Sequence, residues 1–147
     1  MIKKNNTHSV LIFSLIMFMV FVGYLIFKQA EGGVSTLVKD DVISFFTEKI
    51  NDVSPEKPVL GGRWFVTRFR FVDSNNVYVE YEDGHISRAF LLSLTKTTGS
   101  VPDYKIVGYF EPGPMEYKLL SGEDTQKGKT QEIYEYSETA KKWIKVN

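Results

Sequence analysis

The chain contains no cysteine and only two histidines. Without thiols it has no disulfide, no lipid anchor on a cysteine and no Cys-His dyad for nucleophilic catalysis. His8 and His85 are too far apart in the sequence for a classical zinc site. The formal net charge at pH 7 is 0, which excludes the strongly basic surface typical of nucleic-acid binding. We therefore expect no metal, no cofactor and no nucleic-acid partner.

Charged residues are also absent from one long segment, Val10 to Phe27, with the sequence VLIFSLIMFMVFVGYLIF. As a helix it is about 27 Å long, close to the ~30 Å hydrocarbon thickness of a bilayer. It is apolar on every face, unlike a buried core helix, and the following Lys28-Gln29-Ala30 is a poor cleavage site for a signal peptide. We predict a transmembrane helix whose partner is the lipid bilayer. The alternatives are a buried core helix and a cleaved signal peptide.

The charges before this segment predict its orientation. Lys3 and Lys4 precede it, and positive charge stays on the cytoplasmic side. The absence of cysteine from the domain that follows is typical of a bacterial envelope protein. We therefore expect a single-pass signal-anchor protein of the cell membrane. Its expected parts are a cytoplasmic head (1–9), a transmembrane helix (10–27), a linker (28–34) and an extracytoplasmic domain (35–147).

Beyond the apolar segment, the spacing of apolar residues first indicates a helix. Val38, Val42, Phe45 and Phe46 recur with a period of about 3.6 residues, as on one face of an amphipathic helix. Ser35 offers an N-cap oxygen. We expect this helix to run from Thr36 to Ile50 and to end before Pro55 and Pro58.

The period then changes to two, which indicates strands. In the first strand we expect Phe65, Thr67, Phe69 and Phe71 on one face, and Trp64, Val66, Arg68 and Arg70 on the other. Asp83-Gly84 predicts a tight type I′ turn between the second and third strands. The expected strands are Trp64–Val72, Val77–Glu82, His85–Leu94 and Tyr104–Phe110.

The C-terminal part is more polar. Glu132–Tyr136 and Trp143–Val146 predict a small hairpin in which Tyr134, Tyr136 and Trp143 pair. Met115–Leu120 is a short mixed patch, followed by a polar loop. The predicted fold class is α+β: one amphipathic helix packed on a curled antiparallel sheet of about four strands, with a C-terminal hairpin.

This layout resembles the cystatin-like and NTF2-like domains, in which an N-terminal helix packs into the concave side of an antiparallel sheet. The residues behind the resemblance are the helix Thr36–Ile50, the strand Trp64–Val72 and the segment VYVEYEDGHISRAFLL, in which an Asp-Gly turn joins two long strands. The resemblance covers about residues 35–110 and is one of layout rather than of motif. It implies a pocket between helix and sheet, used in that group for ligand binding, for assembly or for catalysis.

Two candidate sites follow from the residues. Glu82, Asp83 and His85 cluster at the predicted hairpin and could bind a metal or move a proton, but successive strand residues point to opposite faces, which favours a hydrated turn. The alternation in the first and third strands suggests a basic aromatic groove for an anionic lipid head, a glycan or a peptide. The alternative is a sheet face on which the arginines pair with Glu80 or Glu82. The residues of the possible binding surface are Trp64, Arg68, Arg70, Arg88 and Phe90.

The functional prediction is a non-catalytic binding or assembly module with a membrane-proximal protein partner. No catalytic constellation is recognisable, and the faces expected to point inward carry mainly Phe, Val, Tyr and Leu. The alternative is an NTF2-like enzyme or small-ligand-binding domain that uses a pocket between helix and sheet.

Overall fold

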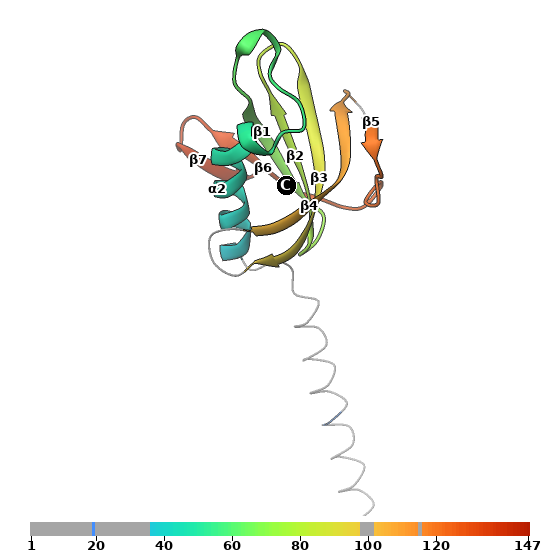
Figure 1. The fold of residues 1–147 in the computed structure, drawn as a ribbon. Helices are drawn as coiled ribbons and strands as arrows, with labels where there is room; N and C mark the ends of the chain where they lie inside the picture. Colours follow the sequence, from blue (N-terminus) through green and yellow to red (C-terminus); the bar gives the residue numbers. More distant parts are fainter. Residues whose placement is uncertain (1–18, 20–35, 98–101, 115) are drawn as a thin grey trace, which may run out of the picture. The chain divides into compact units, whose positions relative to one another are not determined.

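The computed structural model describes residue 19 and residues 36–97, 102–114 and 116–147. Residues 34–147 form one compact unit, and the elements below lie within it. Helix α2 (Thr36–Val53) runs beside the sheet (Figure 1). Its buried face consists of Val42, Ile43, Phe46 and Ile50, at the spacing that the sequence predicts. The helix was expected to end at Ile50, and one further turn brings it to Val53.

Helix α2 is connected to the sheet through its C-terminal end. The Asn51 side chain accepts a hydrogen bond from Trp64 N (2.7 Å) and donates one to Trp64 O (3.1 Å). The Trp64 indole N–H donates to the carbonyl of Glu56 at 2.9 Å. A short 3₁₀ turn, η1 (Val59–Gly61), lies between these residues in the sequence. These bonds pair the polar groups of the buried Trp64 and fix the direction in which the chain enters the first strand.

Seven antiparallel strands form a single sheet with the order β5-β4-β3-β2-β1-β6-β7 (Figure 1). Four of them match the first four predicted strands, with ends shifted by a few residues. The strands are β1 (Phe65–Phe71), β2 (Asn76–Glu82), β3 (Ser87–Thr97), β4 (Pro102–Pro112), β5 (Tyr117–Gly122), β6 (Glu132–Ser137) and β7 (Lys142–Lys145).

The predicted fold class is wrong in the extent of its sheet. The terminal hairpin is not separate, because β6 pairs with β1 from Arg68↔Glu135 to Phe71↔Glu132. The patch after Met115 is a strand, β5, that pairs with β4. Within the hairpin, the expected pair Tyr136↔Trp143 is confirmed, with ring centroids 5.8 Å apart. The four predicted strands are thus extended by β5 at one edge and by β6 and β7 at the other, and all seven form one sheet.

A β-bulge in β1 changes which side chains face α2. The register of β1 against β2 shifts between Val66 and Arg68, so that Thr67 is an additional residue. Trp64 and Val66 therefore pack in the same core as Phe69 and Phe71. The prediction from strict alternation, which placed Trp64 and Val66 on the face opposite Phe69 and Phe71, is wrong because of this bulge. Phe65, expected to face inward, is 62% exposed.

The sheet has a packed cluster on each of its two faces. The larger one lies against α2, and it contains Phe46, Phe69, Val79, Phe90 and Leu92, each 0% exposed. The smaller one, on the other face, contains Tyr78, Ala89, Leu91 and Phe110. Because aromatic and branched side chains fill the space between helix and sheet, the pocket that the family resemblance implies there is occupied by the core.

Lys39 joins α2 to the strands at the far edge of the sheet. Its ammonium donates to Glu132 at 2.7 Å and lies 5.5 Å from the centre of the Phe71 ring. Lys145 reaches the same carboxylate at 3.2 Å. The hydrogen bond from Lys39, with the charges of both lysines, holds the pKa of Glu132 below its usual range although burial opposes this.

Replacing Lys39 with methionine should remove part of the pH dependence of stability. A carboxyl whose pKa is lower in the folded than in the unfolded chain adds stability above its unfolded pKa, about 4.3, and loses it as the pH falls through the folded value. The Glu132 side chain is 44% exposed, so we expect a loss below about 1 kcal/mol at pH 7. Urea unfolding at pH 7 and pH 3 checks this, with Lys145→Met as the more exposed control. An equal loss at both pH values would contradict it.

No helix within the described ranges is long and apolar enough to cross a membrane. The longest of them, α2, has 18 residues and includes Lys39, Asp40, Asp41 and Glu48, whose charges are costly in hydrocarbon. This finding contradicts the predicted fold with a transmembrane helix, and with it the single-pass architecture and the membrane localisation. The segment from Val10 to Phe27 lies outside the described residues except for Met19.

Candidate functional site

The strand order requires one long connection, and this connection builds the site. Strand β5 is at one edge of the sheet, whereas β6 lies beside β1. The segment 123–131 between them, here called the crossover loop, passes over the sheet face opposite α2, where Asp124 accepts a hydrogen bond from the Tyr78 hydroxyl of β2. A positive φ of 80° at Gly128 and the buried Gln126 shape the loop.

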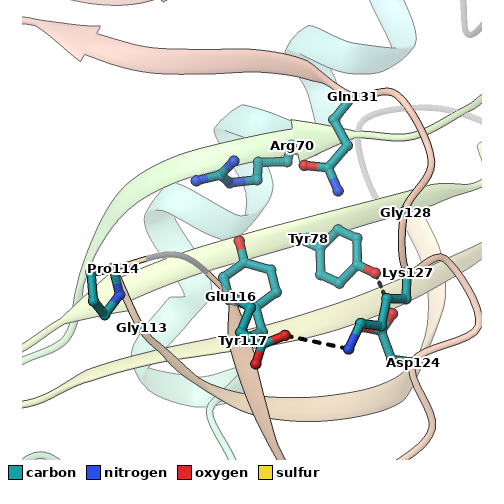
Figure 2. Close-up of a pocket in the computed structure, with 10 residues that line it drawn as sticks. All are labelled: Arg70, Tyr78, Gly113, Pro114, Glu116, Tyr117, Asp124, Lys127, Gly128 and Gln131. Carbon is teal, nitrogen blue, oxygen red and sulfur yellow. Dashed lines mark hydrogen bonds and ion pairs between the residues drawn. The ribbon is translucent and has the colours of Figure 1, made fainter.

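A cavity of about 450 Å³ lies between the crossover loop, the sheet and the β4–β5 connection (Figure 2). The sheet contributes Arg70 and Tyr78 as the floor, and Tyr117 of β5 forms a wall. Its size is within the range of small-ligand sites, roughly 300–1,000 Å³. The lining residues are Arg70, Tyr78, Gly113, Pro114, Glu116, Tyr117, Asp124, Lys127, Gly128 and Gln131.

A nearly buried carboxylate, Glu80, organises the charges beneath the cavity. Its side chain is 10% exposed and pairs with Arg70 Nε at 2.5 Å and with Arg68 Nη1 at 3.3 Å. The Tyr117 hydroxyl donates to the same carboxylate. Burial, together with the charge of Glu80, raises the pKa of Tyr117 well above that of a free phenol. The tyrosine therefore stays protonated and donates a hydrogen bond to Glu80.

Two polar contacts connect the walls of the cavity. The Tyr78–Asp124 hydrogen bond fixes the crossover loop to the sheet, and burial raises the pKa of Tyr78 so that it remains a donor. Glu116, from the β4–β5 connection, pairs with Lys127 of the crossover loop at 3.4 Å. Figure 2 shows this second contact spanning the side of the cavity away from Arg70 and Gln131. Both of its partners are more than 70% exposed, so the contact is weak.

Two glycines allow the crossover loop to leave β5 close to β4. Gly122 has φ +78°, and a Cβ there would lie 2.2 Å from Val107 O. A Cβ on Gly108 would lie 2.4 Å from Glu123 O. Only the absence of side chains at both positions permits this approach, which brings the next residues over the sheet.

The five residues of the predicted binding surface lie on two different faces. Trp64 and Phe90 are buried in the core against α2. Arg88 pairs with Glu56 at 3.0 Å, near the end of the helix. Arg68 and Arg70 lie on the opposite face and pair with Glu80, as the alternative reading proposed. Of the five, Arg70 lines the cavity.

The predicted cluster at the hairpin is a turn. Asp83 accepts backbone hydrogen bonds from His85, Ile86 and Val59, at 2.6–3.0 Å. These bonds lower the pKa of Asp83, and the bond from Ile86 has the largest effect. Gly84 has a positive φ but Asp83 does not, so the turn is a four-residue connection rather than the expected type I′ turn. Within the part of the chain described, no three acidic, histidine or cysteine side chains are grouped to hold a metal ion.

Sequence reasoning missed most of the cavity. Tyr117, Asp124, Lys127 and Gln131 come from the patch after Met115 and from a polar stretch that was expected to be an ordinary loop. One signal was present: Tyr78 and Glu80 alternate with the core residues Val77, Val79 and Tyr81, which places polar groups on the second face of the sheet. Their partners could not be identified without the strand order.

Comparisons of the chain with models of protein families, with curated protein sequences and with solved structures find no match. The resemblance to cystatin-like and NTF2-like domains therefore stays a prediction, and the geometry of the cavity is the basis for proposing a function.

Proposed function

We propose that the domain is a non-catalytic binding module whose ligand occupies the cavity between the crossover loop and the sheet. The observation that carries this proposal is a cavity of about 450 Å³ in which Arg70 and Gln131 lie together against the sheet. Most small-ligand sites are concave, largely preformed and equipped with a few fixed polar groups. The cavity is concave, and its lining carries several such polar groups.

The groups around the cavity favour binding over catalysis. A general acid or base needs a proton that it can exchange with a substrate. Here the carboxylate under the floor, Glu80, is occupied by two arginines and a tyrosine. The Tyr78 hydroxyl is likewise engaged by Asp124. Such an arrangement fixes donors and acceptors in position, which supports recognition of a ligand.

A variant that fills the cavity tests the proposal. We expect Gln131→Trp to block it, because an indole is much larger than the amide and Gln131 lies directly at the lining. Ligand-observed NMR with the full-length protein would use a fragment library of amino acids, sugars, nucleosides and carboxylic acids. The matched control is Lys118→Trp, at a position on β5 whose side chain is 75% exposed and outside the lining.

The expected result is a set of fragments that bind the wild type and Lys118→Trp but not Gln131→Trp. Competition between these fragments would place them at one site. If no fragment depends on the Gln131 position, the cavity is not a binding site and the proposal is contradicted. Thermal unfolding of both variants confirms that each is folded.

A further inference from the structure

We infer that the ligand of this cavity carries both a carboxylate and an ammonium group, as a free α-amino acid or a short peptide does. This inference rests on the proposed function and adds the chemical class of the ligand. It depends on three groups of the lining: the guanidinium of Arg70, the carboxylate of Asp124, which has no ion pair among the described residues, and the side-chain amide of Gln131 beside Arg70.

The cationic fork is Arg70. Its Nε is held by Glu80 at 2.5 Å, and its guanidinium carbon lies 5.8 Å from the centre of the Tyr117 ring. Among the described residues, its hydrogen bond to a carboxylate goes through Nε, so its terminal nitrogens have no carboxylate partner there and can bind one from a ligand. A guanidinium edge fixed in this way matches the two oxygens of a carboxylate.

The carboxylate is Asp124, in the crossover loop. Its Oδ1 accepts hydrogen bonds from the Tyr78 hydroxyl and, at 3.3 Å, from Gln126 N. The ion pairs found in the described part of the chain include none to Asp124, and the neighbouring Lys127 makes its weak ion pair with Glu116. A partly buried carboxylate that lacks a cation is a favourable site for an ammonium group, since each charge compensates the desolvation of the other.

Gln131 supplies the third element. Its side chain lies beside Arg70 in Figure 2, and no hydrogen bond from its amide group to another described residue is found. A primary amide has both donors and an acceptor. It therefore complements a peptide bond placed between the two charged ends of a ligand.

The balance of charge argues against a simple anion or cation. An anion near Arg70 would meet the charge of Asp124, which has no ion pair among the described residues, whereas Glu80 is paired with arginines and Glu116 with Lys127. A simple cation would leave the terminal nitrogens of Arg70 without an acceptor. A zwitterion satisfies both ends without adding net charge, and opposite charges at two positions also fix its orientation.

Three matched dipeptides test the inference by isothermal titration calorimetry of the full-length protein. Glycyl-L-leucine carries both charges, N-acetyl-glycyl-L-leucine lacks the ammonium group, and glycyl-L-leucinamide lacks the carboxylate. We expect the zwitterion to bind about 10-fold or more tightly than either capped form, the effect of one charge-assisted hydrogen bond.

Two conservative variants show which residue binds each charged end of the dipeptide. Asp124→Asn keeps an acceptor for Tyr78 but removes the charge, so it should abolish the preference over the acetylated form and retain the preference over the amide. Arg70→Lys keeps a positive charge without the fork and should do the reverse. Circular dichroism and thermal unfolding of both variants confirm that they fold, so a lost preference reports on recognition.

The outcomes separate this inference from the proposed function. Equal binding of the three dipeptides, or tightest binding of a capped form, overturns the zwitterion. Fragments of another class, such as sugars, that bind only when Gln131 is intact overturn it too, while the binding module stands. If no probe of any class depends on the Gln131 position, both fail.

Discussion

Replacing Glu80 with alanine is expected to lower the free energy of unfolding by about 3–5 kcal/mol, the cost of removing one partner from a buried ion pair. The carboxylate is only 10% exposed. Its removal leaves Arg70 and the Tyr117 hydroxyl without their acceptor on a face that is partly covered by β5. Unsatisfied buried donors keep their full desolvation cost, and Arg70, at 25% exposure, cannot regain full hydration.

Two further variants separate charge from shape at this position. Glu80→Gln keeps the size of the side chain and one acceptor but loses the charge, so we expect a loss of about 1.5–3 kcal/mol. The matched control is Glu135→Gln. Glu135 also pairs with Arg68, at 2.5 Å, but its side chain is 39% exposed, and the expected loss is below about 1 kcal/mol.

Urea unfolding at pH 7 measures all three values. Similar losses for Glu80→Ala and Glu135→Gln would contradict the role of Glu80 as the centre of the charges under the cavity. Glu80→Gln has a second readout. Because Glu80 holds Arg70 through Nε, the variant should also weaken binding of any ligand that the Arg70 fork recognises, even at temperatures where it is fully folded.

The sequence predicted the elements that depend on local periodicity. The buried positions of α2 from Val42 to Ile50 repeat at helical spacing, and residue types alternate in the sequence of β2 although both its faces are buried, so both elements were located within a few residues. These patterns are local properties of the sequence. They do not depend on which strand lies next to which.

The features missed are those that depend on non-local pairing. The bulge after Val66 requires knowledge of the β2 register. Strand β5 carries mostly exposed residues, so it lacks the apolar alternation by which a strand is recognised. The pairing of β6 with β1 joins segments about sixty residues apart in the chain.

The candidate site was missed for the same reason. Arg70 was recognised as part of a binding surface, but its neighbours Asp124 and Gln131 are brought to it by the crossover loop. That loop passes over the sheet only because β5 and β6 lie on different sides of β1–β4. No spacing in the sequence records this arrangement, and a polar loop has the same composition wherever it passes.

Replacing Gly122 with alanine should have the largest effect on the site itself. The position combines a left-handed backbone, φ +78°, with a Cβ that would lie 2.2 Å from Val107 O. The left-handed conformation costs a side chain about 1–2 kcal/mol, and the contact with backbone requires a shift that costs about 1–3 kcal/mol more. We expect a loss of about 2–5 kcal/mol in the free energy of unfolding, the sum of these two effects.

Two other glycines serve as matched controls, because each has only one of the two properties. Gly128 has φ +80° with nothing within 4 Å of the added Cβ, so Gly128→Ala should cost only the backbone penalty, about 1–2 kcal/mol. Gly108 has the close contact, 2.4 Å to Glu123 O, without a positive φ. Gly108→Ala should therefore cost about 1–3 kcal/mol.

The same series separates stability from function at the cavity. Gly122 directly precedes the crossover loop, so the shift that alanine forces there moves Asp124 away from Tyr78 and opens one wall. At a temperature where Gly122→Ala remains folded, it should bind the cavity fragments much more weakly than the wild type. Unfolding by urea gives the order of stabilities, and ligand-observed NMR gives the order of binding. If Gly122→Ala is no less stable than Gly128→Ala, the close approach of Gly122 to β4 does not determine the position of the loop, and the structural basis proposed for the site is wrong.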